Sequence, residues 1–418
     1  MRTESHSQIP DPASTSRYVQ NKQIRITATV ESGIGAFKVE AAIRGEGLRC
    51  ITVRADTAPH AYGLLHEWKT NHSQTGFTIG AQEIHELTAL GILVPAEQMP
   101  QRVLFSSGSD DDLCHPMVEE TEGQPRSSWK LNPDIKLETK EESVSSATSQ
   151  WRQVARLGAD DLVWIQGSRP NLELPYWLNS SEASWVGGLL SRRFDPTEIP
   201  KNICRKLSSI EVVDKDESIS ESRRGWEETF GTARREISQR GYAIIRNLIP
   251  PVFLSALARY YKELLEQGYL LPDTDRIRFS LKNEPFSRWL HRQTQPFIIQ
   301  AIPEVVTATY PYVAVYMAGA DLERHTDRVD CEYTLSLSIN PCALASKAES
   351  WPLYLESRTE GSTVSACLSP GDGIIFKGRE LPHFRLPLPE DRISFSLLFH
   401  YAPAHLRWAN NESATTVL

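Results

Sequence analysis

The stretch "LERHTDRVDCEYTLSLSIN", residues 322–340, is the most informative part of this chain. It places His325 and Asp327 directly before a run in which apolar and polar residues alternate, as they do in a β-strand. Residues two apart at the end of a strand point to the same side, so this imidazole and this carboxylate could hold one ion together. A polar loop that leads into an edge strand could have the same letters, and the rest of the chain has to distinguish the two.

Two further segments suit a metal site. His383, in "GRELPHFRL", follows His325 by 58 positions, and Arg392 comes nine positions after His383. Two histidines and one carboxylate on one face of a metal leave the other face open, which is the ligand set of non-haem Fe(II) oxygenases. We therefore predict a catalytic metal centre with three ligands: His325, Asp327 and His383. An arginine can bind a carboxylate through two parallel hydrogen bonds, so we predict that Arg392, with the hydroxyl of Ser394 beside it, binds a 2-oxo acid.

The C-terminal part of the chain is rich in strands. Six runs of strand-forming residues follow one another between Tyr312 and Tyr401, with no helical pattern between them. Short strands in such a series are typical of a barrel or jelly roll. Ahead of them, the pattern predicts a helix, a strand at 242–245, and a second helix that starts at the prolines of "IPP", where proline suits the first turn.

Residues 241–401 resemble the prolyl-hydroxylase-like branch of the Fe(II)/2-oxoglutarate-dependent oxygenases. The segment "GYAIIRNLIP" resembles the strand with which that family's domain begins, and "YMAGADLERHTDR" resembles its Tyr-x-x-Gly and His-x-Asp run. "SPGDGIIFKGRELPH" resembles the Pro-Gly-Asp turn that precedes the distal histidine. The resemblance implies an α+β protein whose catalytic domain, at 221–410, is a double-stranded β-helix (jelly roll).

The resemblance also implies roles for individual residues. Iron is expected at His325, Asp327 and His383. The cosubstrate 2-oxoglutarate is expected at Arg392, Ser394 and Tyr316, the last standing where the family often directs a tyrosine hydroxyl at it. Prolyl hydroxylases commonly have lysine in place of Arg392, so specificity for proline is not implied. Halogenases of this superfamily have a small residue in place of the carboxylate, and Asp327 argues against that chemistry.

Other polar residues near these motifs have two possible roles. Arg324 and Arg328 flank the metal pair and could hold a substrate carboxylate, or they could be solvated charges at the rim. The remaining histidines of this region are expected to be core, rim or helix-surface residues rather than ligands: His291, His400 and His405.

The N-terminal half has a different pattern. After a polar lead-in at 1–22, we predict a domain at 23–105 with glycine-separated strands, two helices and a final short strand, "GILV". This order is that of a small winged-helix unit, and it loosely resembles the leader-peptide-binding domains of enzymes that modify ribosomally made peptides. A purely structural accessory domain is the alternative.

A Ser-, Glu- and Asp-rich stretch follows at 106–150. It carries ten acidic and four basic residues, so −6 of the net charge of −8 lies here, and we predict an acidic disordered linker. We predict a second accessory unit at 151–220. Its "VGGLLSRRF…EIPKNICRKLSSIEVV" compares with "AYGLLHEWK…EIHELTALGILV" of the first unit, which indicates either a repeat or a chance similarity.

Composition restricts the function classes. The net charge of −8 disfavours nucleic acid as a partner. No apolar run approaches the roughly 18 residues that span a bilayer, and the N-terminus lacks the apolar core of a signal peptide. Six scattered cysteines without a C-x-x-C pair fit reduced thiols, so a cytoplasmic protein without a membrane partner is expected.

Together these features predict a dioxygenase that uses Fe(II), 2-oxoglutarate and O₂ to hydroxylate an unactivated C–H bond. The residues ahead of the catalytic domain favour a peptide or protein substrate, such as a ribosomal natural-product precursor. Two alternatives stay open: a hydroxylase of a small metabolite or free amino acid, and a binding protein that senses 2-oxoglutarate or oxygen.

Overall fold

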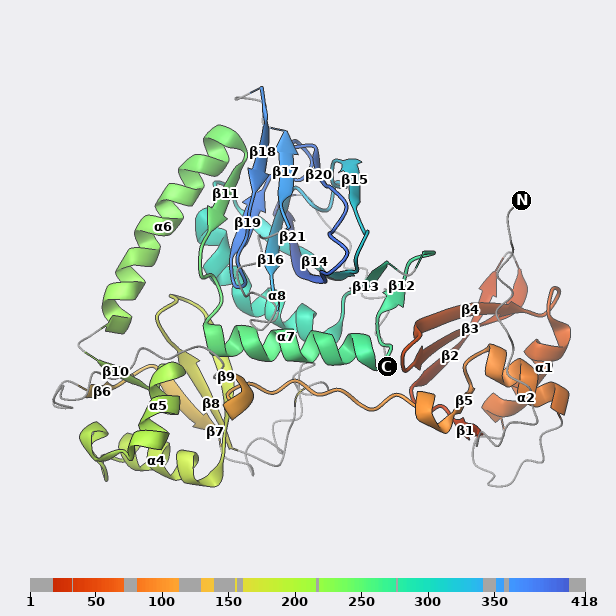
Figure 1. The fold of residues 1–418 in the computed structure, drawn as a ribbon, viewed down its shortest axis with the longest axis horizontal. Coiled ribbons are helices and arrows are strands. Elements are labelled where there is room, and N and C mark those ends of the chain that lie inside the picture. The colour runs from red at the N-terminus through yellow and green to blue at the C-terminus, as the bar shows by residue number, and fades with distance from the viewer. Residues whose placement is uncertain are drawn as a thin grey trace. The chain divides into compact units, whose positions relative to one another are not determined.

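The structure is a computed structural model that describes residues 18–31, 33–70, 81–112, 129–138, 155, 161–215, 218–275, 277–340, 351–356 and 361–405. The chain divides into two compact units (Figure 1). The first consists of residues up to Arg102 together with Leu264–Leu271, and the second consists of Val103–Glu263 and residues from Pro272 onward. Within the described ranges, no helix is long and apolar enough to cross a membrane.

The first unit is one β-β-β-α-α-β module with an added N-terminal strand. Its antiparallel sheet contains β2 (Ile24–Glu31), β3 (Ile34–Ile43) and β4 (Gly47–Arg54) in that order. The helices α1 (Pro59–Thr70) and α2 (Ala81–Ala89) follow, and β5 (Leu93–Pro95) then pairs with β1 (Tyr18–Gln20). The sheet and the helices bury a common apolar core: Phe37, Val39, Val53, Leu65, Leu87, Leu90 and Ile92. The strands and helices follow in the predicted order, whereas the assignment of a winged-helix-like, peptide-binding domain stays a prediction.

A buried asparagine joins the parts of this module. The Nδ2 of Asn21 donates to the carbonyls of Ala42 and Gly91, at 2.8 and 3.0 Å. Its backbone amide donates to the carbonyl of Ile92 at 2.8 Å, and its Oδ1 accepts from the amide of Gln23 at 2.9 Å. Asn21 therefore holds the turn between β1 and β2 against the ends of β3 and α2.

The second unit starts with the same module. An antiparallel sheet of β7 (Ile135–Glu138), β8 (Asp161–Gln166) and β9 (Glu173–Leu178) precedes α4 (Ser180–Leu190) and α5 (Lys201–Ser209). The flanking strands β6 (Trp129–Leu131) and β10 (Val213–Lys215) pair with each other. Both modules thus contain the same elements in the same order, with the first strand paired to the last.

Asn132 makes the same four hydrogen bonds in the second module that Asn21 makes in the first. Its Nδ2 donates to the carbonyls of Gln166 and Glu211, at 3.3 and 2.9 Å. Its amide donates to Val212 at 2.9 Å, and its Oδ1 accepts from the amide of Asp134 at 3.0 Å. The two modules thus share their topology and the hydrogen bonds of a buried asparagine, and their origin as a repeat stays a prediction.

Part of the predicted linker at 106–150 is ordered, in contrast to the expectation. The strands β6 and β7 lie within it, because apolar residues alternate with charged ones from Trp129 to Leu137 and the strands pair with β10 and β8. The second copy therefore begins at Trp129 rather than at 151, and the first begins at Tyr18 rather than at 23. The remaining linker positions 113–128 and 139–150, like 1–17 of the lead-in, lie outside the described residues.

After the second module the chain continues with helices and short strands, and then with eight strands. First come α6 (Ser218–Arg240), β11 (Tyr242–Ile245), α7 (Pro251–Glu266), β12 (Leu271–Pro272), β13 (Arg278–Lys282) and α8 (Pro285–Ile298). The eight strands are β14 (Val306–Tyr316), β15 (Leu322–His325), β16 (Tyr333–Ser338), β17 (Leu353–Glu356), β18 (Thr363–Ala366), β19 (Gly373–Phe376), β20 (His383–Arg385) and β21 (Ser394–Pro403).

These strands form two antiparallel sheets (Figure 1). One has the order β11-β19-β16-β21-β14-β13-β12, and the other has the order β15-β20-β17-β18. From β14 to β21 the chain passes repeatedly from one sheet to the other, which is the arrangement of a jelly roll. The helix α8 covers the outer face of the larger sheet, where the ring of His291 stacks on Phe399 at 4.7 Å between centroids. His291 is thus buried in the core rather than on the helix surface.

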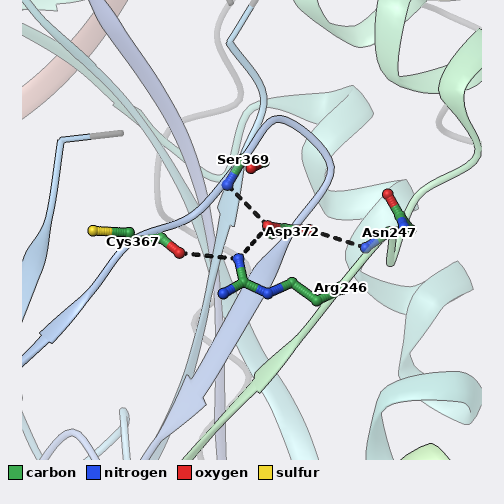
Figure 2. Close-up of a pocket in the computed structure, with 5 residues that line it drawn as sticks. All are labelled: Arg246, Asn247, Cys367, Ser369 and Asp372. Carbon is green, nitrogen blue, oxygen red and sulfur yellow. Dashed lines mark hydrogen bonds and ion pairs between the residues drawn. The ribbon is translucent and has the colours of Figure 1, made fainter. Parts of the chain in front are cut away.

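The Pro-Gly-Asp turn before β19 joins this strand to its neighbour β11. The buried carboxylate of Asp372 accepts hydrogen bonds from the backbone amides of Ser369 and Asn247, at 2.8 and 3.0 Å. It also accepts one from Arg246 at 2.5 Å, and Figure 2 shows all three converging on it. The aspartate of this motif therefore has a structural role.

We expect Asp372→Ala to lower the free energy of unfolding by about 3 kcal/mol, because two backbone amides lose their acceptor at a site of low solvent access. Little of this loss is assigned to Arg246, since its side chain is 56% exposed and water screens that ion pair. Chemical denaturation measures the change. Arg246→Gln serves as the matched control, with an expected loss below about 1 kcal/mol.

Candidate metal centre

Three predicted ligands converge between the two sheets. The strands β15 and β20 pair so that His325 lies opposite His383, and Asp327 follows β15. The Nε2 atoms of both histidines lie 3.7 Å from Oδ1 of Asp327. One donor atom from each of the three residues falls within 4.8 Å of the others. This spacing suits a single ion held by all three.

Hydrogen bonds fix which imidazole nitrogen is available to a metal. The Nδ1 of His325 lies 2.8 Å from the carbonyl of Glu323, and the Nδ1 of His383 lies 3.0 Å from the carbonyl of Leu381. A carbonyl can only accept, so each Nδ1 carries the proton and each Nε2 presents its lone pair. Burial also lowers the pKa of His383, which keeps this imidazole neutral and able to bind a metal near pH 7.

The other oxygen of Asp327 is held by a chain of polar groups. The hydroxyl of Thr334 donates to Oδ2 of Asp327 at 2.6 Å, and it lies 3.0 Å from Nδ1 of His400. A hydroxyl has one proton, and this proton is given to the carboxylate, so Nδ1 of His400 must be the donor to Thr334. Burial lowers the pKa of His400 to about 4, so its ring is neutral at pH 7. This hydrogen bond engages Oδ2 of Asp327 and leaves Oδ1 as the oxygen that could hold a metal.

A glycine leaves room for this carboxylate. The amide of Asp327 donates to the carbonyl of Gly378 at 2.8 Å, and a Cβ added at Gly378 would lie 2.1 Å from Oδ2 of Asp327. Real atoms do not approach so closely, so any side chain at this position displaces the ligand. Gly378 belongs to the segment "FKGRELPH", in which only the histidine was predicted as a site residue.

We expect Thr334→Val to weaken binding of Fe(II) or Mn(II) by about 10–100-fold, because partners that orient a metal ligand typically contribute that much. Thr334→Ser keeps the hydroxyl and is expected to bind the metal as the unchanged protein does. Calorimetric titration with Mn(II) compares the two variants. A valine variant with undiminished affinity would contradict a role for this hydroxyl in positioning Asp327.

The metal ligands face a cavity of about 370 Å³, which is the size of a small-molecule site. Its walls also contain Tyr316 and Arg328 from the predicted set. Other polar residues there were not predicted as site residues: Arg278, Lys282, Tyr310, Tyr312, Cys331, Ser336, Arg385, Ser396 and His400. Their apolar neighbours are Leu322, Leu353, Phe376 and Leu398.

Three predicted site residues do not belong to the described cavity wall. Ser394 lies opposite Tyr316 at the start of β21, and Arg392 comes just before that strand with its Nε 3.9 Å from Oδ1 of Asp391. Arg324 is directed away from His325 by the alternation of β15, and both its Nε and Nη2 donate to Glu356 at 2.6 Å. The structure thus brings the metal ligands, Tyr316 and Arg328 together in the described cavity wall. It places Ser394 opposite Tyr316, whereas Arg324 and Arg392 do not belong to that wall.

Arg385 is a candidate site residue that was not predicted from the sequence. It lies two residues after His383 on β20, so both side chains face the cavity. The guanidinium donates to the carbonyl of Trp351 and lies 4.6 Å from the centroid of its ring. Burial lowers the pKa of Arg385 to about 10, which leaves it charged at pH 7. Among the described residues Arg385 has no ion pair, and the signal for it was the motif His-x-Arg.

No family model matches this sequence, and no curated protein matches it significantly. Among solved structures, the chain is similar to a prolyl-4-hydroxylase of Pseudomonas putida, with 18% identity over 42% of this chain and 98% of that one, and a TM-score of 0.34. It is also similar to a Trichoplax adhaerens prolyl hydroxylase in complex with a hypoxia-inducible-factor peptide (16% identity, 46% and 96% coverage, TM-score 0.36). A third is HygX from Streptomyces hygroscopicus with nickel and 2-oxoglutarate bound (9%, 43% and 89%, TM-score 0.34). At these low values, function has to follow from the site itself.

Proposed function

We propose that the second unit is an Fe(II)/2-oxoglutarate-dependent dioxygenase that hydroxylates an unactivated C–H bond. One observation carries the proposal: Nε2 of His325, Nε2 of His383 and Oδ1 of Asp327 converge, with each Nδ1 turned to a backbone carbonyl. Two neutral imidazoles and one carboxylate suit Fe(II) and leave several of its coordination positions open. When bound, iron with 2-oxoglutarate and O₂ supplies the oxidising chemistry, while the protein binds and orients the reactants.

We assign the far carboxylate of 2-oxoglutarate to Arg385, with Tyr316 beside it. A buried guanidinium that lacks an anionic partner is costly, and a bound carboxylate relieves that cost. Burial raises the pKa of Tyr316, so its phenol keeps the proton it needs to donate a hydrogen bond. Arg392 and Ser394 are the assignment suggested by sequence, and they lie at the start of the strand whose inner face lines the cavity.

The apolar walls of the cavity limit the access of water to the metal site. Leu322, Leu353, Phe376 and Leu398 line the space, and Leu353 and Phe376 are almost fully buried. Exclusion of water strengthens every electrostatic contact within the site and suppresses side reactions. The apolar walls thus support the positioning of the metal ligands and the cosubstrate.

The duplicated module favours a peptide or protein as the primary substrate. Catalysis on a free amino acid or small metabolite needs only the jelly roll. Besides the jelly roll, this chain has two β-β-β-α-α-β modules. Peptide capture by these modules gives them a role. Hydroxylation of a small metabolite is the alternative within the enzyme class, and a protein that senses 2-oxoglutarate or oxygen is the alternative outside it.

Anaerobic reconstitution with Fe(II) and 2-oxoglutarate tests the proposed function. The full chain is expected to develop the visible metal-to-ligand absorption of an Fe(II)–2-oxo acid complex and, once oxygen is admitted, to form succinate. His325→Ala is the control and is expected to show neither signal. Absorption without succinate would favour the sensor, and the absence of both from the unchanged protein would remove iron and 2-oxoglutarate from its function.

A further inference from the structure

The cavity beside the metal ligands has an excess of positive charge. Four cationic side chains line it, namely Arg278, Lys282, Arg328 and Arg385, whereas Asp327 supplies the only carboxylate of its described wall. A bound divalent ion and the two carboxylates of 2-oxoglutarate neutralise each other. The net charge of the cavity wall, from four cationic side chains and the carboxylate of Asp327, is then strongly positive. A cavity with such a charge attracts anions.

The cations belong to two ends of the cavity. Arg278 pairs with Tyr316 across β13 and β14. Burial raises the pKa of Tyr316, and the charges of Arg385 and Arg278 oppose that rise, so both cations act on this phenol. Lys282 lies four residues further along β13, about 13 Å from Arg278 at the usual rise per residue. The Tyr316 end therefore has two cations of its own for the far carboxylate of 2-oxoglutarate.

Lys282 belongs to the metal end. Its Nζ lies 3.7 Å from the centroid of the Tyr310 ring, and its charge lowers the pKa of His400, the residue that supports Asp327 through Thr334. Arg328 follows Asp327 directly in the chain and lines the same cavity.

The described residues neutralise neither cation at the metal end. Among the described residues, Lys282 and Arg328 form no ion pair, and both are exposed at the mouth of the cavity. Arg324 is different, because it is held by Glu356 on the outer face of the smaller sheet. Lys282 and Arg328 are therefore available to an incoming anion in a way that Arg324 is not.

We infer that the primary substrate carries a carboxylate that binds between Lys282 and Arg328, close to the C–H bond that reacts. This inference rests on the proposed function and specifies the substrate class of the same site. A guanidinium and an ammonium together hold a carboxylate firmly and fix its orientation. A volume of about 370 Å³ admits one side chain or one small acid in addition to the cosubstrate, so the carboxylate belongs to an acidic residue of a peptide or to a free acid.

Paired probes test this inference on the full chain loaded with Mn(II) and saturating 2-oxoglutarate. The probes are N-acetylglutamate and N-acetylglutamine, and the N-acetylated tripeptide amides Gly-Glu-Gly and Gly-Gln-Gly. Paramagnetic broadening of their proton resonances reports binding near the metal. In at least one pair, the carboxylate is expected to bind about tenfold more tightly than its amide, a difference of about 1.4 kcal/mol. The pair that shows the preference distinguishes a peptide from a free acid.

Three variants complete the test. Lys282→Gln and Arg328→Gln are each expected to remove most of the preference for the carboxylate, and Arg324→Gln, the matched control, is expected to retain it. Equal binding of carboxylate and amide in both pairs, or no broadening of any probe, would overturn the inference. Broadening of the 2-oxoglutarate resonances in the same samples reports on the proposed function, so its failure is recognised separately.

Discussion

Asp327→Asn is expected to abolish turnover and to weaken Fe(II) binding by more than about 100-fold. Loss of a residue that merely supports a metal ligand costs about 10–100-fold in affinity, and loss of a charged ligand costs more. The replacement keeps the size of the side chain and the space beside Gly378, so the jelly roll is expected to stay folded. Metal affinity by calorimetry and succinate formation by mass spectrometry measure the two effects.

Asp330→Asn is the matched control for this prediction. Asp330 lies three positions further along the chain and, within the described residues, does not belong to the metal-ligand group or the cavity wall. Its variant is expected to bind Fe(II) and to form succinate at nearly the rate of the unchanged protein. If Asp327→Asn retained Fe(II) affinity, the assignment of the three ligands would be wrong even if activity were lost.

Arg385→Met is expected to raise the KM for 2-oxoglutarate by about 10–150-fold, since a charge-assisted hydrogen bond contributes about 1.5–3 kcal/mol. The same variant is expected to unfold at an unchanged or higher temperature. The guanidinium of Arg385 is buried without an ion pair in the described residues, and an apolar side chain of similar volume removes the cost of desolvating it. A residue with a purely structural role would show the opposite pattern, with stability lost and KM unchanged.

Arg392→Met distinguishes the two possible anchors of the cosubstrate. If Arg385 binds the far carboxylate, Arg392→Met leaves the KM for 2-oxoglutarate within about threefold, as expected for a partly exposed side chain that contributes little. If instead Arg392→Met raises KM strongly while Arg385→Met does not, the anchor is the residue that the spacing from His383 predicted. Steady-state kinetics with 2-oxoglutarate as the varied reactant are sufficient for both variants.

The two modules show why local sequence patterns predicted their helices but not all of their strands. The helical parts of both modules could be compared directly, because Gly-Leu-Leu recurs in α1 and α4 and Glu-Ile recurs in α2 and just before α5. The strands β6 and β7 were assigned to a linker because they are only three and four residues long and lie among acidic and serine residues. Their order comes from pairing with β10 and β8, partners far along the chain that no local window contains. The equivalence of Asn21 and Asn132 became visible only through their shared hydrogen bonds.

The identity of the metal ligands was accessible from sequence alone. A metal site demands particular side chains at constrained spacings, so His325, Asp327 and His383 could be selected without coordinates. The strands of the C-terminal region could also be predicted from the sequence, because the alternation of apolar and polar residues with a period of two is a local property.

The directions of the arginines depended on tertiary structure. Arg385 follows His383 by two positions and Arg392 follows it by nine, and only Arg385 lines the described cavity. Arg324 and Arg328 both flank the metal pair, and it is pairing with Glu356 on a neighbouring part of the sheet that holds Arg324 outward. The sequence by itself thus determined which groups could bind a metal. Only the fold decided which charges face that metal, because a side chain's direction depends on strand register and on partners distant in the chain.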